Sequence, residues 1–171
     1  MFDKQFVMKQ KIIFDQISEL LTGKGIKFRR EGGEGQFYKF EANVDERVIG
    51  CMLNCDLNRK LLTFSAILLY QIPNNKMLEC LELMARFNEK IWYGAFEFSF
   101  EYNLVSSVTT LPIDNSTISY EQLERLCFNN LLNVHFFQNG FEKLITKNLK
   151  IEDISNEIIT LYESSGQNKN K

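Results

Sequence analysis

Two segments of alternating residues, 47–56 and 61–70, constrain the fold more than any other part of the chain. A short turn between them would form an antiparallel hairpin in which Asp56 lies opposite Leu61. In this register one face of the hairpin is apolar throughout, so we expect that face to point to the protein core. Its residues are Ile49, Cys51, Leu53, Cys55, Leu62, Phe64, Ala66 and Leu68.

The opposite face of the same hairpin is polar near the turn and apolar at the far end. The apolar residues there, which we call the outer cluster, are Val48, Met52, Ile67 and Leu69. An antiparallel sheet that left such a cluster in water would be unusual, so we predict that the outer cluster is covered. Either a protein partner or a helix from the C-terminal part of the same chain could cover it.

The remaining segments alternate between helical and strand periodicity. We expect helices at 3–22, 73–93 and 119–138, and strands at 26–30, 36–43, 96–102 and 105–112, with a glycine-rich loop at 31–35. Ser119 and Gln122 form a capping box at the start of the third helix, and Asn139 with Gly140 is a candidate break at its end. Segments 141–149 and 151–162 would then continue it and add a fourth helix.

Two of these segments carry specific expectations about burial. Strict alternation in 96–102 predicts that four aromatic side chains, ending with Phe100 and Tyr102, face the core. The apolar stripe expected for the second helix consists of Met77, Leu78, Leu81, Met84, Ala85, Phe87 and Ile91. Together, the elements predict an α+β fold in which helices pack on an antiparallel sheet, in the order α-β-β-β(-β)-α-β-β-α(-α).

Length and charge limit the organisation and the partners of the chain. With 171 residues, we expect one α+β domain over residues 1–163, followed by a flexible polar tail at 164–171. The net charge is −2 and the lysines are scattered, which argues against nucleic acid as a partner. No apolar run is long enough to span a membrane, so we expect a cytoplasmic protein.

The sequence contains no recognisable catalytic, cofactor-binding or metal-binding group of residues. His135 is the only histidine, and we expect the four cysteines to be reduced and mostly buried. The only concentrated positive charge, at Lys24, Lys27, Arg29 and Arg30, fits a solvated edge strand better than an RNA-binding surface. We therefore expect neither an enzyme nor a cofactor.

Part of the chain resembles the YbjN family of bacterial proteins, which has a fold like that of type III secretion chaperones. The resemblance covers about residues 60–131. It is carried by 62–66 before Pro73, Phe87 with Asn88, Gly94, Phe96, Leu111 with Pro112, and 119–123. It implies a small bacterial regulator without a catalytic motif, and it identifies no functional residues.

We therefore expect a non-enzymatic accessory protein that binds a protein partner or a second copy of itself through the outer cluster. Secretion chaperones of the resembled fold are typically homodimers that hold an extended client segment, which makes such a chaperone one alternative. A small-ligand-binding protein or an enzyme with an unrecognised pocket is the other alternative.

Overall fold

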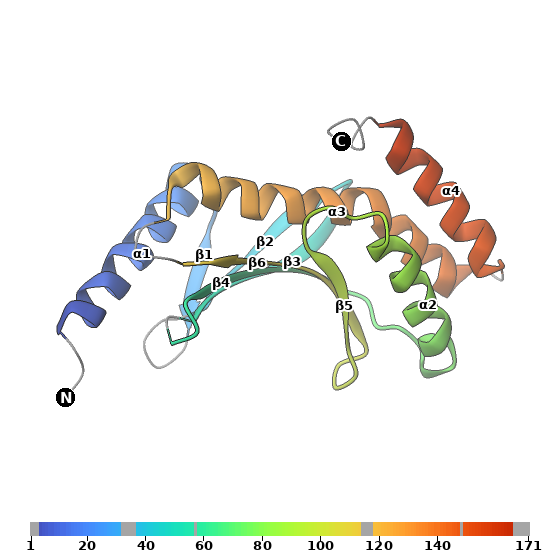
Figure 1. Ribbon diagram of the computed structural model, residues 1–171. Helices are drawn as coiled ribbons and strands as arrows, with labels where there is room; N and C mark the ends of the chain where they lie inside the picture. Colours follow the sequence, from blue (N-terminus) through green and yellow to red (C-terminus); the bar gives the residue numbers. More distant parts are fainter. Residues whose placement is uncertain (1–3, 32–36, 57, 114–117, 148, 166–171) are drawn as a thin grey trace.

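The computed structural model describes residues 4–31, 37–56, 58–113, 118–147 and 149–165, which form four α-helices, a short 3₁₀ helix and six strands (Figure 1). In chain order the elements are α1 Lys4–Gly23, β1 Phe28–Glu31, β2 Phe37–Val44, β3 Arg47–Asp56, β4 Leu61–Leu68, η1 Asn74–Lys76, α2 Met77–Asn88, β5 Ala95–Ser99, β6 Leu104–Pro112, α3 Tyr120–Thr146 and α4 Ile151–Ser164. This order confirms the predicted α+β architecture. Most of the expected glycine-rich loop and most of the expected polar tail lie outside the described residues.

The six strands form one antiparallel sheet in the order β1-β2-β3-β4-β6-β5. Asp56 pairs with Leu61 and Ile49 pairs with Leu68, so the predicted register of the β3–β4 hairpin is confirmed. All eight residues assigned to its core face are buried. The alternation of side-chain type along the two strands was therefore sufficient to determine which face meets the core.

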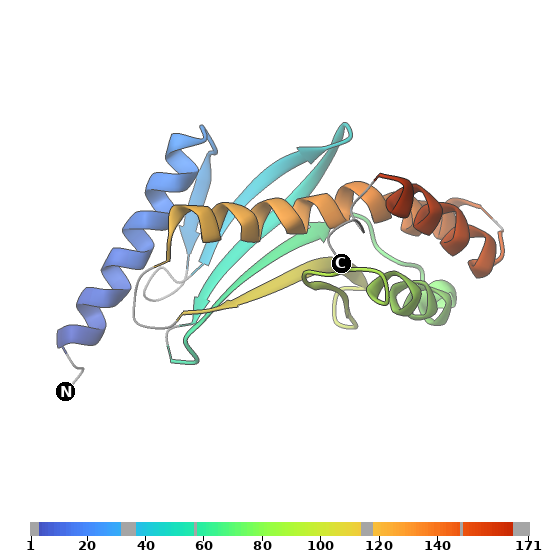
Figure 2. The same ribbon diagram turned by 45° about the horizontal axis from the view of Figure 1, so that its top comes forward.

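The helices lie on one side of the sheet (Figures 1 and 2). Helix α1 lies at the β1 end, α3 crosses over the strands, and α2 and α4 pack with α3 beyond the other end of the sheet. Among the described residues, no helix covers the opposite side of the sheet, which we call the outer face. Because α4 packs against α2 and α3, the alternative in which a C-terminal helix covers the outer cluster is wrong for the described chain.

Four phenylalanines, which we call the aromatic cluster, join α2, β5 and α3. The ring of Phe87 lies 4.7 Å from that of Phe137, 5.5 Å from Phe141 and 6.4 Å from Phe96, measured between centroids. Tilted and edge-on contacts of this kind add to the stability gained by burying apolar area. This cluster fixes α2 and α3 to the β5 end of the sheet.

The expected stripe on α2 is partly wrong. Its buried residues are Cys80, Leu83, Met84 and Phe87, whereas Leu78 and Ala85 are exposed. The observed set follows the spacing i, i+3, i+4 and i+7 of one helical face, but the expected set mixed two faces. The helix also ends at Asn88, earlier than its apolar pattern suggested.

The aromatic strand is shorter than its alternation predicts. Strand β5 ends at Ser99, and the chain then turns back through Asn103, which has a positive φ of 52°. Phe96 is buried, but Phe100 and Tyr102 are 66% and 58% exposed. The expectation that all four aromatic side chains face the core is therefore wrong, because the turn interrupts the pleat.

Helix α3 begins with the predicted capping box, in which Ser119 accepts from the Gln122 backbone N–H and the Gln122 side chain accepts from the Ser119 backbone N–H. The expected break at Asn139 and Gly140 does not occur, because α3 continues to Thr146. Gly140 is buried between Phe87 and Ile158, where packing rather than a turn accounts for the glycine.

The side chain of Asn88 connects the end of α2 to β5. Its Nδ2 donates to the Phe96 carbonyl at 3.0 Å, and its Oδ1 accepts from the Phe96 backbone N–H at 2.7 Å. We expect Asn88→Ala to lower the free energy of unfolding by about 1–3 kcal/mol, because both partly buried backbone groups lose their partner. Urea denaturation measures this effect. Asn156→Ala is the matched control: Asn156 is exposed on α4, so its truncation should change the free energy of unfolding by no more than about 0.5 kcal/mol, and a cost equal to that of Asn88→Ala would contradict this role.

Candidate functional site

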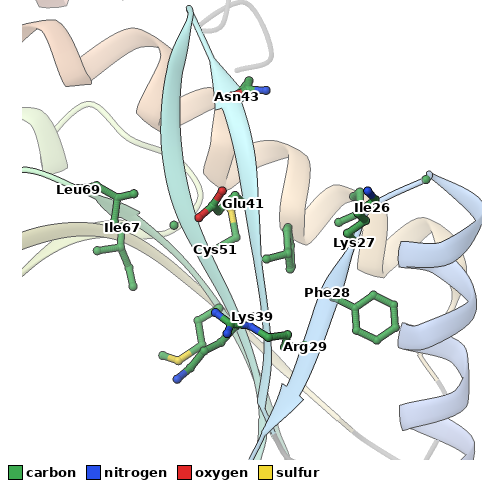
Figure 3. Close-up of a pocket in the computed structure, with 14 residues that line it drawn as sticks. Ile26, Lys27, Phe28, Arg29, Lys39, Glu41, Asn43, Cys51, Ile67 and Leu69 are labelled. Carbon is green, nitrogen blue, oxygen red and sulfur yellow. The ribbon is translucent and has the colours of Figure 1, made fainter.

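A hollow lies on the outer face, at the β1 end of the sheet (Figure 3). We call it the outer groove; its volume is about 710 Å³. Its lining residues are Gly25, Ile26, Lys27, Phe28, Arg29, Lys39, Phe40, Glu41, Asn43, Gly50, Cys51, Met52, Ile67 and Leu69. They come from the segment around β1, from β2 and β3, and from β4 with the residue after it.

A glycine in the middle of β3 creates the depth of the outer groove. Gly50 lies between Glu41 of β2 and Ile67 of β4 in the sheet register, so the row across these strands lacks one side chain. A Cβ atom added there would lie 3.1 Å from the Leu69 Cδ2 atom. Glycine within a strand often marks a place where a ligand or another backbone approaches closely. The sequence pattern alone does not indicate this role of Gly50.

The apolar end of the groove contains three of the four residues of the outer cluster. Met52 and Ile67 are half-buried, and Leu69 is 56% exposed. Val48 does not line the groove, but it lies on the same face opposite Asn43 and is 47% exposed. The structure thus places the four predicted residues on one uncovered surface.

The other end of the groove is basic. Lys27, Arg29 and Lys39 line it, and Arg29 lies directly opposite Lys39 in the β1–β2 register. Figure 3 shows Lys39 and Arg29 next to each other, away from Ile67 and Leu69. Lys39 bonds to Glu31 at 2.5 Å, and this hydrogen bond lowers the pKa of the Glu31 carboxyl below its usual value.

The four residues of the predicted basic stretch therefore lie in three different environments. Lys24 forms an ion pair with Glu124 on α3, at 2.5 Å. Arg30 lies on the core side, with its guanidinium carbon 4.4 Å from the Phe14 ring centroid. Only Lys27 and Arg29 remain for the outer groove, and in the part of the chain that the structure describes neither forms an ion pair with a carboxylate. The expected edge position of this segment is confirmed, because β1 is the first strand of the sheet.

Strand β1 is half as long as its neighbour. Its residues 28–31 pair with residues 37–40 of β2, so residues 41–44 of β2 extend beyond it. Over the described residues, no other strand pairs with this half of β2 on that side. Backbone N–H and C=O groups that point out of such an edge are able to pair with an added strand.

The described residues of the groove do not combine a nucleophile with a base. Burial raises the pKa of the Cys51 thiol to about 12, so the thiol stays protonated at neutral pH. His135 lies elsewhere, on α3, where its Nδ1 atom is 2.7 Å from Asp45 at the β2–β3 turn. Burial likewise raises the pKa values of Cys55, Cys80 and Cys127 to about 12.

Neither a metal-binding cluster nor a membrane-spanning helix is found among the described residues. In these ranges, no group of three or more histidine, cysteine or carboxylate side chains is arranged to hold a metal ion. No described helix combines the length and the apolar character needed to cross a membrane.

Comparisons with known proteins identify a family and a fold. The YbjN family, described as "Putative bacterial sensory transduction regulator", matches residues 14–143. The solved structure of YbjN from E. coli, described as "a putative transcription regulator", has a TM-score of 0.54 and 12% identity, and the alignment covers 74% of this chain and 91% of that one. No curated protein matches the chain.

A second similar structure comes from the HopA1–SchA chaperone–effector complex. Its matched chain has a TM-score of 0.53 and 14% identity, and the alignment covers 84% of this chain and 99% of that one. The fold of the present chain is therefore of the type found in YbjN and in a chain of a chaperone–effector complex. At these identities the likeness concerns the fold.

Proposed function

Because the chain belongs to the YbjN family, we propose that it is a non-enzymatic accessory protein that acts by binding another protein chain on its outer face. The observation that carries this proposal is the uncovered outer cluster. Its four apolar residues lie on a sheet face that no described helix covers, although helices pack on the opposite face. Covering such a surface is favourable because it removes apolar area from water.

The open half of the β2 edge favours an extended partner. A segment that pairs with residues 41–44 of β2 would lie between this half of β2 and residues 25–27, which line the groove, and would gain backbone hydrogen bonds. Its side chains would then reach the outer groove, which begins beside this edge. The chain of similar fold from a chaperone–effector complex supports this reading, since that complex is one between two proteins. In its more specific form, the proposal is therefore that the protein holds an extended segment of a client protein.

The proposal is tested by placing a charge in the outer cluster with Ile67→Glu. We expect wild-type protein, immobilised and exposed to extract of its native cells, to retain specific proteins that Ile67→Glu does not retain, because a carboxylate must be desolvated when the face is covered. Light scattering of both proteins in solution shows whether the partner is a second copy. A wild-type dimer that becomes monomeric on substitution would identify self-association.

Thr63→Glu is the matched control. Thr63 lies on the same strand and the same face, four residues closer to the turn, and it does not line the groove. We expect Thr63→Glu to keep the partners and the hydrodynamic size of the wild type. The proposal is wrong if correctly folded Ile67→Glu keeps both as well.

A further inference from the structure

The outer groove has a definite charge pattern, which limits what can occupy it. Its lining includes three cationic side chains, Lys27, Arg29 and Lys39, and one anionic side chain, Glu41. The chain as a whole carries a net charge of −2, so the groove is a positive region on a negative protein. Charge complementarity therefore favours an acidic partner at this surface.

Two of the three cationic side chains, Lys27 and Arg29, form no ion pair within the described residues, whereas Lys39 is paired with Glu31. Arg29 and Lys39 lie directly opposite each other, and like charges in this position destabilise a strand pair. The Glu31 carboxylate is bonded to Lys39, and Glu41 lies on the β2 side of Gly50, nearer the middle of the groove. Glu31 offsets part of this repulsion, because it pairs with Lys39 and its carboxylate also interacts with the charge of Arg29. An incoming carboxylate near Arg29 and Lys27 would balance the positive charge that remains.

The apolar end lies a short distance from the basic end. Arg29 and Met52 lie in one row two strands apart, which corresponds to roughly 10 Å, whereas Ile67 is three strands from Arg29 and two residues further along its strand, which corresponds to roughly 16 Å. Residues two and four positions apart in an extended chain point the same way and lie roughly 7 Å and 13 Å apart. One short extended segment is thus long enough to contact both ends.

We propose that the outer groove binds a segment of another protein in which an acidic side chain is followed or preceded, within about four residues, by large apolar side chains. The carboxylate meets Arg29 and Lys27, and the apolar side chains lie on Met52, Ile67 and Leu69. Gly50 leaves the space through which the segment passes between these ends. This inference rests on the proposed function, and it adds the chemistry of the partner.

The test uses a phage-displayed library of random dodecapeptides, selected on the full-length wild-type protein. We expect the enriched peptides to combine Asp or Glu with Leu, Ile, Met or Phe at this spacing. Fluorescence anisotropy then compares their affinities for wild type and Arg29→Glu. Charge reversal should weaken binding by about fivefold or more, and so should added salt, because the contact lies at a solvent-exposed rim.

Two further variants make the result specific. Gly50→Thr fills the groove with a residue that favours strands, and Leu69 is exposed enough to move aside, so this variant should fold and fail to bind. Arg59→Glu makes the same change in net charge at the β3–β4 turn, away from the groove, and should keep the affinity within about twofold.

Each alternative result overturns the inference in a recognisable way. Peptides without acidic residues, or equal affinities for Arg29→Glu and Arg59→Glu, would exclude the acidic component while leaving protein binding on the outer face intact. A wild-type dimer that Ile67→Glu dissociates would show that a second copy occupies the groove instead. No enriched peptide together with no partner and no dimer would exclude both this inference and the proposed function.

Discussion

Phe87→Ala is expected to lower the free energy of unfolding by about 3–5 kcal/mol, the usual cost of removing a large side chain from a packed core. Phe87 is fully buried, and its ring contacts those of Phe96, Phe137 and Phe141. Truncation would leave a cavity at the point where α2, α3 and β5 meet. The change is measured by urea denaturation, monitored by circular dichroism.

Phe128→Ala provides the matched control on α3. Phe128 is 61% exposed and is the same residue type, so its truncation should change the free energy of unfolding by no more than about 0.5 kcal/mol. If both substitutions cost the same, the aromatic cluster would not be the structural centre of this end of the molecule.

The fold could be predicted from the sequence where apolar and polar residues alternate with the period of a strand or a helix. Alternation in 47–56 and 61–70 determined both the hairpin register and the buried face, and both are confirmed. The capping box at Ser119 located the start of α3 to the residue, because two side chains bond two specific backbone N–H groups there.

Periodicity was misleading where the chain turns without a change in composition. The aromatic alternation continues to Tyr102, yet β5 ends at Ser99. The turn that follows depends on the backbone angles of Asn103, and the alternation of side-chain type contains no information about those angles. The number of apolar residues on α2 was likewise larger than one face can bury. Burial was decided by contacts with α3 and α4, which lie far away in the sequence.

The candidate site could be predicted only in part, for the same reason. The outer cluster follows from one hairpin, whose register is local. The basic end of the groove could not be predicted in this way. Its prediction depends on three tertiary contacts: β1 pairs with β2, Arg30 points to the core and Lys24 reaches α3. Gly50 and Lys39 gave no signal of their own, because their role depends on strands that become neighbours only on folding.

Gly140→Ala is expected to lower the free energy of unfolding by about 1–2 kcal/mol, although alanine in a helix is by itself favoured over glycine by about 1 kcal/mol. A Cβ atom at this position would lie 2.6 Å from the Phe87 Cζ atom and 2.9 Å from its Cε2 atom. The Phe87 ring cannot move aside because the aromatic cluster surrounds it. Urea denaturation measures the loss.

Gly23→Ala is the matched control, because Gly23 is also helical and a Cβ atom there would have no neighbour within 4 Å. We expect Gly23→Ala not to lower the free energy of unfolding. A stricter test places Gly140→Ala in a Phe87→Leu background, since leucine lacks the Cζ and Cε2 atoms that the new methyl group would meet. We expect the cost of Gly140→Ala to fall there by about 1 kcal/mol, a coupling typical of residues in contact. An unchanged cost in that background would show that the glycine serves the backbone of α3 and not its packing against α2.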